Sequence, residues 1–565
     1  MEKLSEIRKS RIHHYVSRWV PLAIVIGFFS GIVMALFMIF IELLLSLTSE
    51  RLAPITIVLA GLIAALLVKF GASEVEGPGI TWIIQKKNMR IPISPRVILT
   101  RFIGSGASLG LRMPGGKEGP AMQIGGSLAY IIGKHLLKLN EDDLSTAITI
   151  GGGACTSAIF QAPLGGTIFA TEVPYKRDLE SDIYMPAFLA SIVAVTTYLF
   201  ISGFVKIIEP FRLNFQSHQI GFSLDWVALA VLLGAVIGGF SYLYTHAFTF
   251  FAKQIDRMGK SWIQILLTAT VVGILVWLGG LFTKAPVAET GFQLLHWLSS
   301  NEQFLELNFL FALFILKMLI ILFCIGGGNP VGIFGPSLIL GALAGTIFAV
   351  VMGQTDYVGD FFILGMASMM AGTSKTPISS MILILEITGL PHLVLYMAIT
   401  NTVTYILSGS TTLYTNQLTY RREAIAQELE GKDYLAFIPI TSIMTDKVLS
   451  LNAEMTVDDS RSYLAFHHKH SMPVIEQSTG QLVGFTSVED LRGVQGEKTI
   501  NEVMVKDVVT IQSDKTLKEA LDQVLSFEVE RFPITDSSGR MVGFVTLHDM
   551  LRALRKQEKM EKILS

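Results

Sequence analysis

The chain has 565 residues, of which 51% are hydrophobic and only 16% are charged, whereas soluble domains average about 25% charged residues. This composition excludes an ordinary soluble protein. The formal net charge of −2 averages two unlike regions and points to no partner such as nucleic acid. Apolar runs of the length needed to cross a lipid bilayer recur along most of the chain. They include Val20–Phe40, Ile55–Phe70, Val227–Phe251 and Ile263–Phe282.

The first segment, residues 1–18, is basic and lacks a small-residue cleavage site before the first apolar run. We therefore expect an uncleaved N-terminus in the cytoplasm, and an integral protein of the bacterial inner membrane. The membrane domain is predicted over residues 19–418.

Glycine and proline interrupt three apolar segments of this domain, at Gly77–Gly79, Gly115–Pro120 and Gly332–Pro336. Unsatisfied backbone groups in lipid cost several kcal/mol, so broken helices need surrounding protein or a water-filled path. A helix that starts at such a break points free N–H groups and a positive dipole end into the path. Glycines that only allow close helix packing are the alternative. Three such motifs favour a site for an anion.

Glu118 lies inside the second of these interruptions. A carboxylate at membrane depth costs roughly 2.5–3.5 kcal/mol on insertion scales, which makes it a functional candidate. Beside a helix start it could occupy the place of the anion itself, so that protonation or displacement would open the path. Pairing of Glu118 with Lys117 or Arg112 is the structural alternative.

The membrane domain contains an internal repeat. Residues 114–120 match residues 330–336 at an offset of 216, with Gly125 matching Gly341, and residues 162–172 match 376–386 at an offset of 214. Such repeats are often inverted and place the substrate site at their interface near the membrane midplane. We predict an all-α membrane domain with inverted repeats and broken, tilted helices.

The composition changes near Tyr420, where short strand-like and helix-like segments with ordinary charge density begin. A charged helical linker is predicted over residues 419–435. A second repeat follows, with Met444 and Met504 60 residues apart. It predicts two α/β modules at 436–495 and 496–557, each ordered strand, helix, strand, strand, helix.

Neither the cysteines, Cys155 and Cys324, nor the histidines form a metal-binding pattern, and no nucleophile–base arrangement of a hydrolase is visible. We expect no enzyme, no metal and no required cofactor.

These motifs resemble the CLC family of voltage-gated chloride channels and anion/proton exchangers, with a C-terminal pair of CBS domains. Gly77-Pro-Gly-Ile80, Gly116-Lys-Glu-Gly-Pro120 and Gly332-Ile-Phe-Gly-Pro336 are similar to the three anion-site loops of the family. Tyr414 falls where the family places its coordinating tyrosine. The resemblance implies an inverted-repeat fold and a homodimer with one pore in each subunit.

The resemblance also implies residue roles. Glu118 would be the gate, and the backbone N–H groups of Ile333 and Phe334 with the phenol of Tyr414 would hold the central anion. The remaining anion-binding positions are expected at Pro78, Gly79, Gly116, Lys117 and Gly119.

Two positions depart from the commonest family pattern. Pro78 stands where a serine usually donates a hydroxyl, which resembles the plant vacuolar nitrate/proton exchangers and leaves chloride or nitrate as the anion. Val173 stands where proton-coupled members usually carry an inner glutamate, which resembles the channel branch. Some exchangers manage without this glutamate.

The soluble pair resembles CBS tandems that bind adenine nucleotides. Thr546 and Asp549 fit the hydroxyl and carboxylate pattern that contacts a ribose, and Thr486 and Asp490 are taken as their counterparts. A pair that only helps to hold the dimer together is the alternative.

The leading hypothesis is therefore passive, channel-like transport of chloride or a similar monovalent anion, gated by Glu118. A proton-coupled exchanger of chloride or nitrate is the alternative. A CBS-regulated cation carrier is more remote, because the loops offer N–H donors and few carboxylates.

Overall fold

A computed structural model gives the structure of the chain. It describes residues 2–205, 221–283, 285–288, 294, 297, 306–421, 423, 433–446, 448–467, 469–525, 531–546 and 549–550. The chain divides into two compact units, residues 1–424 and 425–565, which are described separately. Most of the predicted linker lies outside the described residues.

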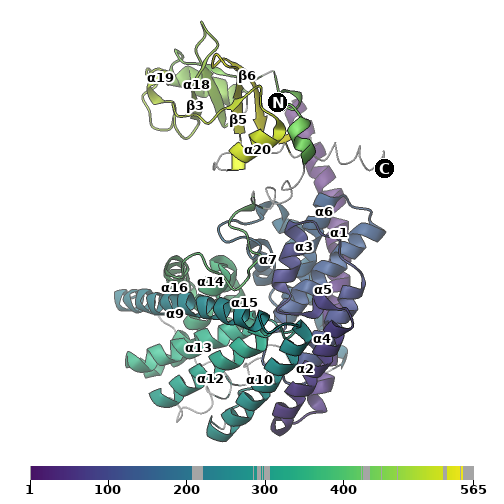
Figure 1. Ribbon diagram of the computed structural model, residues 1–565. Helices are drawn as coiled ribbons and strands as arrows, with labels where there is room; N and C mark the ends of the chain where they lie inside the picture. Colours follow the sequence, from purple (N-terminus) through teal and green to yellow (C-terminus); the bar gives the residue numbers. More distant parts are fainter. Residues whose placement is uncertain are drawn as a thin grey trace. The chain divides into compact units, whose positions relative to one another are not determined.

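The first unit is helical (Figure 1). Within the described residues, seven helices are long and apolar enough to cross a membrane, so the chain is an integral membrane protein. The first half of the unit consists of α1 (Glu2–Ser46), α2 (Ala53–Lys69), α3 (Ile80–Asn88), α4 (Arg96–Gly110), α5 (Glu118–Ile131), α6 (Glu141–Phe160), α7 (Pro163–Glu172) and α8 (Tyr184–Val205).

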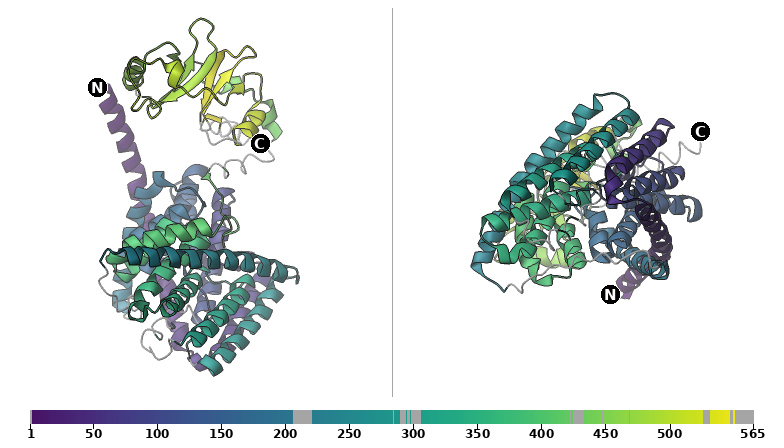
Figure 2. Two further views of the ribbon diagram at one scale, coloured as in Figure 1. Left: turned by 90° about the vertical axis from the view of Figure 1, so that its left-hand side faces the viewer. Right: turned by 90° about the horizontal axis from the view of Figure 1, so that it is seen from below.

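The second half consists of α9 (Leu224–Asp256), α10 (Ser261–Thr283), α12 (Leu307–Gly326), α13 (Phe334–Val351), α14 (Val358–Ser374), α15 (Pro377–Thr388) and α16 (Val394–Leu407). Figure 2 shows the two halves side by side, the first in purple and blue and the second in teal and green.

Helix packing in one half repeats in the other. The pairs α1–α8, α5–α6 and α6–α7 correspond to α9–α16, α13–α14 and α14–α15. Two pairs of equivalent helices, α2–α10 and α7–α15, also pack against each other and join the halves. The repeat read from the sequence is thus a repeat of the three-dimensional structure.

A shared corner explains the second repeated motif. Helix α6 ends in the left-handed residue Gln161, at φ +55°, and α14 ends in Lys375, at φ +58°. Each is followed by one non-helical residue and by a proline, Pro163 or Pro377, at the first position of the next helix. Proline suits this position because the first N–H of a helix has no partner within the helix.

Glycine is required where α5 crosses α6 and where α13 crosses α14. A Cβ on Gly125 would overlap the carbonyl of Gly151, and a Cβ on Gly341 would overlap the carbonyl of Gly365. Small residues at these crossings let the helices approach closely without an aqueous driving force.

The second unit contains two similar sheets. The first is formed by β1 (Leu451–Asn452), β2 (Ser471–Ile475) and β3 (Leu482–Ser487), and the second by β4 (Ile511–Gln512), β5 (Arg531–Thr535) and β6 (Met541–Thr546). In each, the short first strand is parallel to the second, and the third is antiparallel.

Helices α18 (Val457–Phe466), α19 (Ile500–Val503) and α20 (Leu517–Leu525) accompany these sheets. The predicted helix at the end of the first module is wrong. Residues 489–493 form turns, and Gly493 at φ +80° interrupts any continuation as a helix.

Candidate functional site

Two repeat-related helix starts meet in the centre of the membrane unit. Gly116 and Gly332, directly before α5 and α13, form an antiparallel bridge, with N–H to O=C distances of 2.7 and 2.6 Å. Both helices therefore begin at one place and direct their unpaired first N–H groups there. The two equivalent chain segments run antiparallel to each other at this bridge, as expected for an inverted repeat.

The start of α3 joins them. Gly79, at φ +86°, precedes the helix, and the carbonyl oxygen of Pro78 lies against Gly119, so closely that a Cβ there would overlap it. A Cβ on Gly119 would also lie 3.2 Å from the Cα of Gly332. The three interruptions noted in the sequence are thus brought together. Convergent helix starts suit an anion, because each contributes N–H donors and a partial positive charge.

The carboxylate of Glu118, the first residue of α5, lies at this convergence. Glu118 is completely buried, and no side chain of a described residue donates a hydrogen bond to its carboxylate. The carboxylate interacts instead with the backbone N–H groups of Glu118 and Gly335 and, electrostatically, with Lys117. Its nearest surroundings are the backbones of Gly116, Gly332 and Gly335. Of the two structural partners considered from the sequence, Arg112 instead donates to the carbonyl oxygens of Leu45 and Thr48, whereas Lys117 interacts electrostatically with Glu118.

A buried guanidinium lies behind the first loop. Arg101 of α4 has no exposed surface and donates to the carbonyl oxygens of Val75 at 2.5 Å and Gly77 at 2.7 Å. No carboxylate of a described residue pairs with it. The sequence analysis missed Arg101, although an arginine within an apolar helix is itself a signal of a functional position.

Aromatic side chains surround the start of α13. Phe334 packs against Phe160 and Phe169, with ring centroids 5.5 and 5.1 Å apart. Tyr414 is buried and interacts electrostatically with Glu118 and with Tyr244 of α9. The hydroxyl of Tyr244 is buried beside the side chain of Ser337, with which it interacts, and nothing in the local sequence marks Tyr244.

The end of α7 carries Glu172 and Val173. Glu172 accepts hydrogen bonds from the backbone N–H groups of Ile378 and Ser379, at 3.2 and 2.8 Å, and so caps α15. Glu386 of α15 in turn caps α7. Val173 is fully buried and offers no titratable group.

The soluble unit carries the nucleotide-binding candidates. Thr546 donates from its N–H and hydroxyl to one carboxylate oxygen of Asp549, at 3.0 and 2.6 Å. In the first module Ser487 makes the same two bonds to Asp490, at 2.8 and 2.7 Å. The counterpart of Thr546 is therefore Ser487, and the pairing with Thr486 was wrong by one residue. The hydroxyl of Thr486 is buried without a partner among the described residues.

Comparison with known families gives two matches. A family model described as "Voltage gated chloride channel" matches residues 60–409, and a CBS domain model matches residues 440–497 and 500–556. Among curated proteins, the chain is similar to the H(+)/Cl(-) exchange transporters ClcA of Salmonella typhi and Salmonella arizonae. The identities are 30% and 29%, each over 357 residues that cover 61% of this chain and 74% of the relative.

Solved structures share the fold. A slow cyanobacterial Cl−/H+ antiporter is 22% identical with a TM-score of 0.60, covering 73% of this chain and 99% of its own. A eukaryotic CLC transporter is 18% identical with a TM-score of 0.59 and covers 95% of this chain and 98% of its own.

Proposed function

The chain belongs to the voltage gated chloride channel family, and on that premise we propose that it exchanges a monovalent anion, chloride in the first place, for protons across the membrane. The observation that carries the proposal is the completely buried carboxylate of Glu118, which faces backbone N–H groups at the meeting point of α3, α5 and α13. One group at this point can respond both to an anion and to a proton.

The chemistry follows from competition for the same N–H donors. An ionised Glu118 places its own negative charge at the helix starts and keeps an anion out. Protonation removes that charge, so the side chain leaves and an anion takes its place. The N–H groups of Ile333 and Phe334 and the phenol of Tyr414 would hold the central anion, while those near Gly79, Gly116, Lys117 and Gly119 would serve the outer positions.

The curated relatives support exchange over passive conduction, because those named above are H(+)/Cl(-) exchange transporters. This reverses the order of the two hypotheses drawn from the sequence. Passive conduction remains the second candidate, and Val173 is the observation that favours it.

Three further parts of the proposal follow the family resemblance. The protein forms a homodimer with one path in each subunit, in the bacterial inner membrane. Its N-terminus and CBS pair face the cytoplasm. An adenine nucleotide binds the CBS pair beside Asp490 and Asp549, where one oxygen of each carboxylate is already hydrogen-bonded to Ser487 or Thr546.

Flux measurements in liposomes test the exchange. Vesicles loaded with chloride and diluted into a chloride-free medium are held at zero membrane potential with potassium and valinomycin. We expect chloride efflux with simultaneous proton uptake into the vesicles. Chloride efflux without proton uptake would support passive conduction, and the absence of any anion efflux would contradict both.

A further inference from the structure

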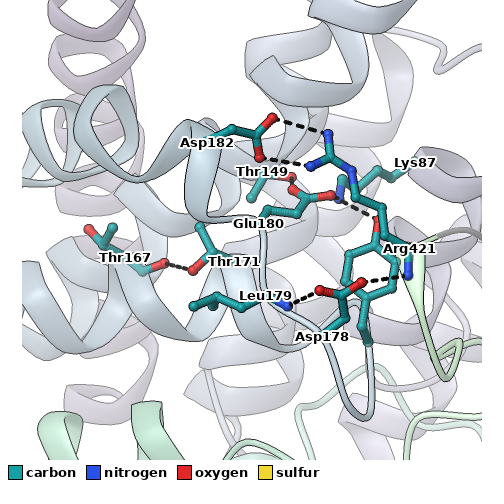
Figure 3. A network of polar contacts seen from close by, with 10 residues as sticks. Lys87, Thr149, Thr167, Thr171, Asp178, Leu179, Glu180, Asp182 and Arg421 are labelled. Atoms are coloured by element: carbon teal, nitrogen blue, oxygen red, sulfur yellow. Dashed lines mark hydrogen bonds and ion pairs between the residues drawn. The ribbon is translucent and has the colours of Figure 1, made fainter. Parts of the chain in front are cut away.

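A second buried carboxylate lies away from the anion site, in a group of polar side chains. Glu180, in the loop between α7 and α8, is only 4% exposed. It accepts hydrogen bonds from the ammonium of Lys87, from the hydroxyl of Tyr175 at 2.9 Å and from the hydroxyl of Thr149 at 3.2 Å. We call Lys87, Thr149, Tyr175 and Glu180 the inner cluster (Figure 3).

The inner cluster adjoins the position where the inner carboxylate is missing. The N–H of Glu180 donates to the carbonyl of Thr171 at 3.2 Å, in the last turn of α7. Val173 follows that turn directly. The loop after α7 thus folds back onto the last turn of this helix. It places Glu180, which carries a carboxylate, at the same helix end as Val173, which carries none.

Lys87, itself buried, joins the inner cluster to a small pocket. Lys87 lies in the last turn of α3, the helix that begins at the anion loop. It also lines this pocket, whose volume is about 10 Å³. Such a volume holds the centre of roughly one water molecule. Lys86, Arg90 and Glu141 also line this pocket. A water molecule in this pocket would lie beside Lys87, whose ammonium donates to Glu180.

The pocket and the cluster lie on the face from which the chain leaves the membrane unit. Arg421, shortly before the second unit begins, forms two hydrogen bonds with Asp182, at 2.8 and 3.2 Å, and its N–H donates to Asp178 at 3.0 Å. Asp178 and Asp182 belong to the same loop as Glu180 (Figure 3). The charged groups around Glu180 are thus Lys87 from α3 and, farther out, Arg421, Asp178 and Asp182.

Stability alone is a poor explanation for this ion pair. Removing two charges from water costs several kcal/mol for each ion, so well-packed apolar side chains are often equally stable or more stable. The carboxylates of Glu172 and Glu386, described above, have structural roles, because Glu172 caps α15 and Glu386 caps α7. Glu180 precedes the short 3-10 helix η4 (Ser181–Ile183), but its side chain makes no capping hydrogen bond to it.

We propose that Glu180 is the group through which protons enter this exchanger from the face that carries the linker, in place of the carboxylate absent at Val173. This inference rests on the proposed proton/anion exchange. The ammonium of Lys87 transfers its shared proton to the carboxylate of Glu180, which leaves a neutral amine and a neutral acid. The amine takes up a proton from a hydronium ion in the pocket, which becomes water, and Glu180 releases its own proton toward Glu118. The net result is the movement of one proton from the pocket toward Glu118 in each cycle.

Separate measurement of the two fluxes tests the proposal in liposomes holding the full-length protein. The variants are Glu180→Gln and the double variant Lys87→Met with Glu180→Gln, which removes both charges and avoids an unpaired buried ammonium. Glu172→Gln is the matched control, because it neutralises a carboxylate at the same helix end. We expect Glu180→Gln and the double variant to retain chloride efflux while proton uptake falls by about tenfold or more. The control should keep the wild-type flux ratio.

The outcomes are distinguishable. A wild-type protein without proton uptake would overturn the proposed exchange itself. A coupled wild type with an unchanged flux ratio in Glu180→Gln or in the double variant would overturn the role of Glu180 alone. Loss of chloride efflux in both would make the inner cluster structural and would also overturn the proposal, as would uncoupling by Glu172→Gln to the same extent.

Discussion

At the starts of α5 and α13 the backbone is nearly the same. Lys117 precedes α5 at φ −93° and ψ −11°, and Ile333 precedes α13 at φ −92° and ψ −16°. The next residue differs, however, since α5 begins with the carboxylate of Glu118 and α13 with the ring of Phe334. The duplicated backbone supplies N–H donors twice, while the carboxylate at the helix starts comes from α5 and has no counterpart at the start of α13.

The same contrast holds at a second pair of equivalent positions. Arg101 and Lys317 are related by the offset of 216, and both are buried cations that donate to backbone carbonyl oxygens. Arg101 binds the carbonyl of Gly77 in the anion loop, whereas Lys317 binds that of Val287 at 2.7 Å. The two equivalent cations therefore differ in their relation to the anion site, because Arg101 contacts the anion loop and Lys317 contacts Val287 instead.

The largest effect is expected where the halves differ most. Glu118→Gln removes the titratable group and keeps the side-chain shape. We expect proton uptake to fall to that of protein-free vesicles, while anion flux rises and loses its dependence on external pH. Chloride efflux and proton uptake at several external pH values measure this. Glu386→Gln, a carboxylate of the second half, is the control and should remain coupled. A Glu118→Gln protein with wild-type fluxes at each pH would exclude Glu118 as the gate.

A smaller effect is expected for the two buried cations. Arg101→Gln removes a charged donor from the anion loop, and hydrogen bonds to charged groups contribute about 1.5–3 kcal/mol. We therefore expect anion binding to weaken by on the order of tenfold, as measured by calorimetry on purified protein. Lys317→Gln should leave anion affinity unchanged. Equal losses in both variants would contradict the assigned asymmetry.

Pro78 should have a more modest effect on selectivity. Pro78→Ser adds a hydroxyl and an N–H to the loop before α3. A hydrogen bond contributes about 0.5–1.5 kcal/mol, which corresponds to a roughly two- to tenfold shift of the chloride-over-nitrate permeability ratio toward chloride. Bi-ionic reversal potentials give this ratio. An unchanged ratio would remove Pro78 from the account of selectivity.

The smallest effect on transport is expected in the CBS unit, whose halves are nearly alike. Asp549→Asn should weaken binding of ATP, ADP or AMP to the full-length protein and leave proton coupling unchanged. Asp536→Asn, another carboxylate of this unit, should bind as wild type does. Calorimetry at millimolar nucleotide distinguishes the two, and an absence of heat with the wild type would favour a purely structural CBS pair.

Part of this structure could be predicted from sequence patterns. The glycine and proline interruptions and their offset predicted the repeat and the convergence of α3, α5 and α13, because broken helices at membrane depth have few tolerated arrangements. Arg101 carried a signal that was overlooked. The inner cluster had none, because Lys87, Thr149 and Glu180 lie far apart in the chain and only the packing of α3, α6 and the loop after α7 brings them together.

The pairing of Thr486 with Thr546 failed for a different reason. Adjacent residues of the first module, Thr486 and Ser487, both carry hydroxyls, and the spacing to the aspartate was overlooked. Thr546 precedes Asp549 by three residues, as Ser487 precedes Asp490, whereas Thr486 precedes Asp490 by four. The register became clear from the hydrogen bonds to Asp490.

The reversal potential in a planar bilayer is the most direct test of proton-coupled exchange. Purified protein is placed under a fixed chloride gradient, and only the pH on one side is changed. Proton-coupled exchange predicts that the reversal potential moves with pH, because each cycle carries protons in the direction opposite to the anion. A reversal potential that stays at the Nernst potential of the anion at every pH would contradict exchange and would assign the chain to passive conduction.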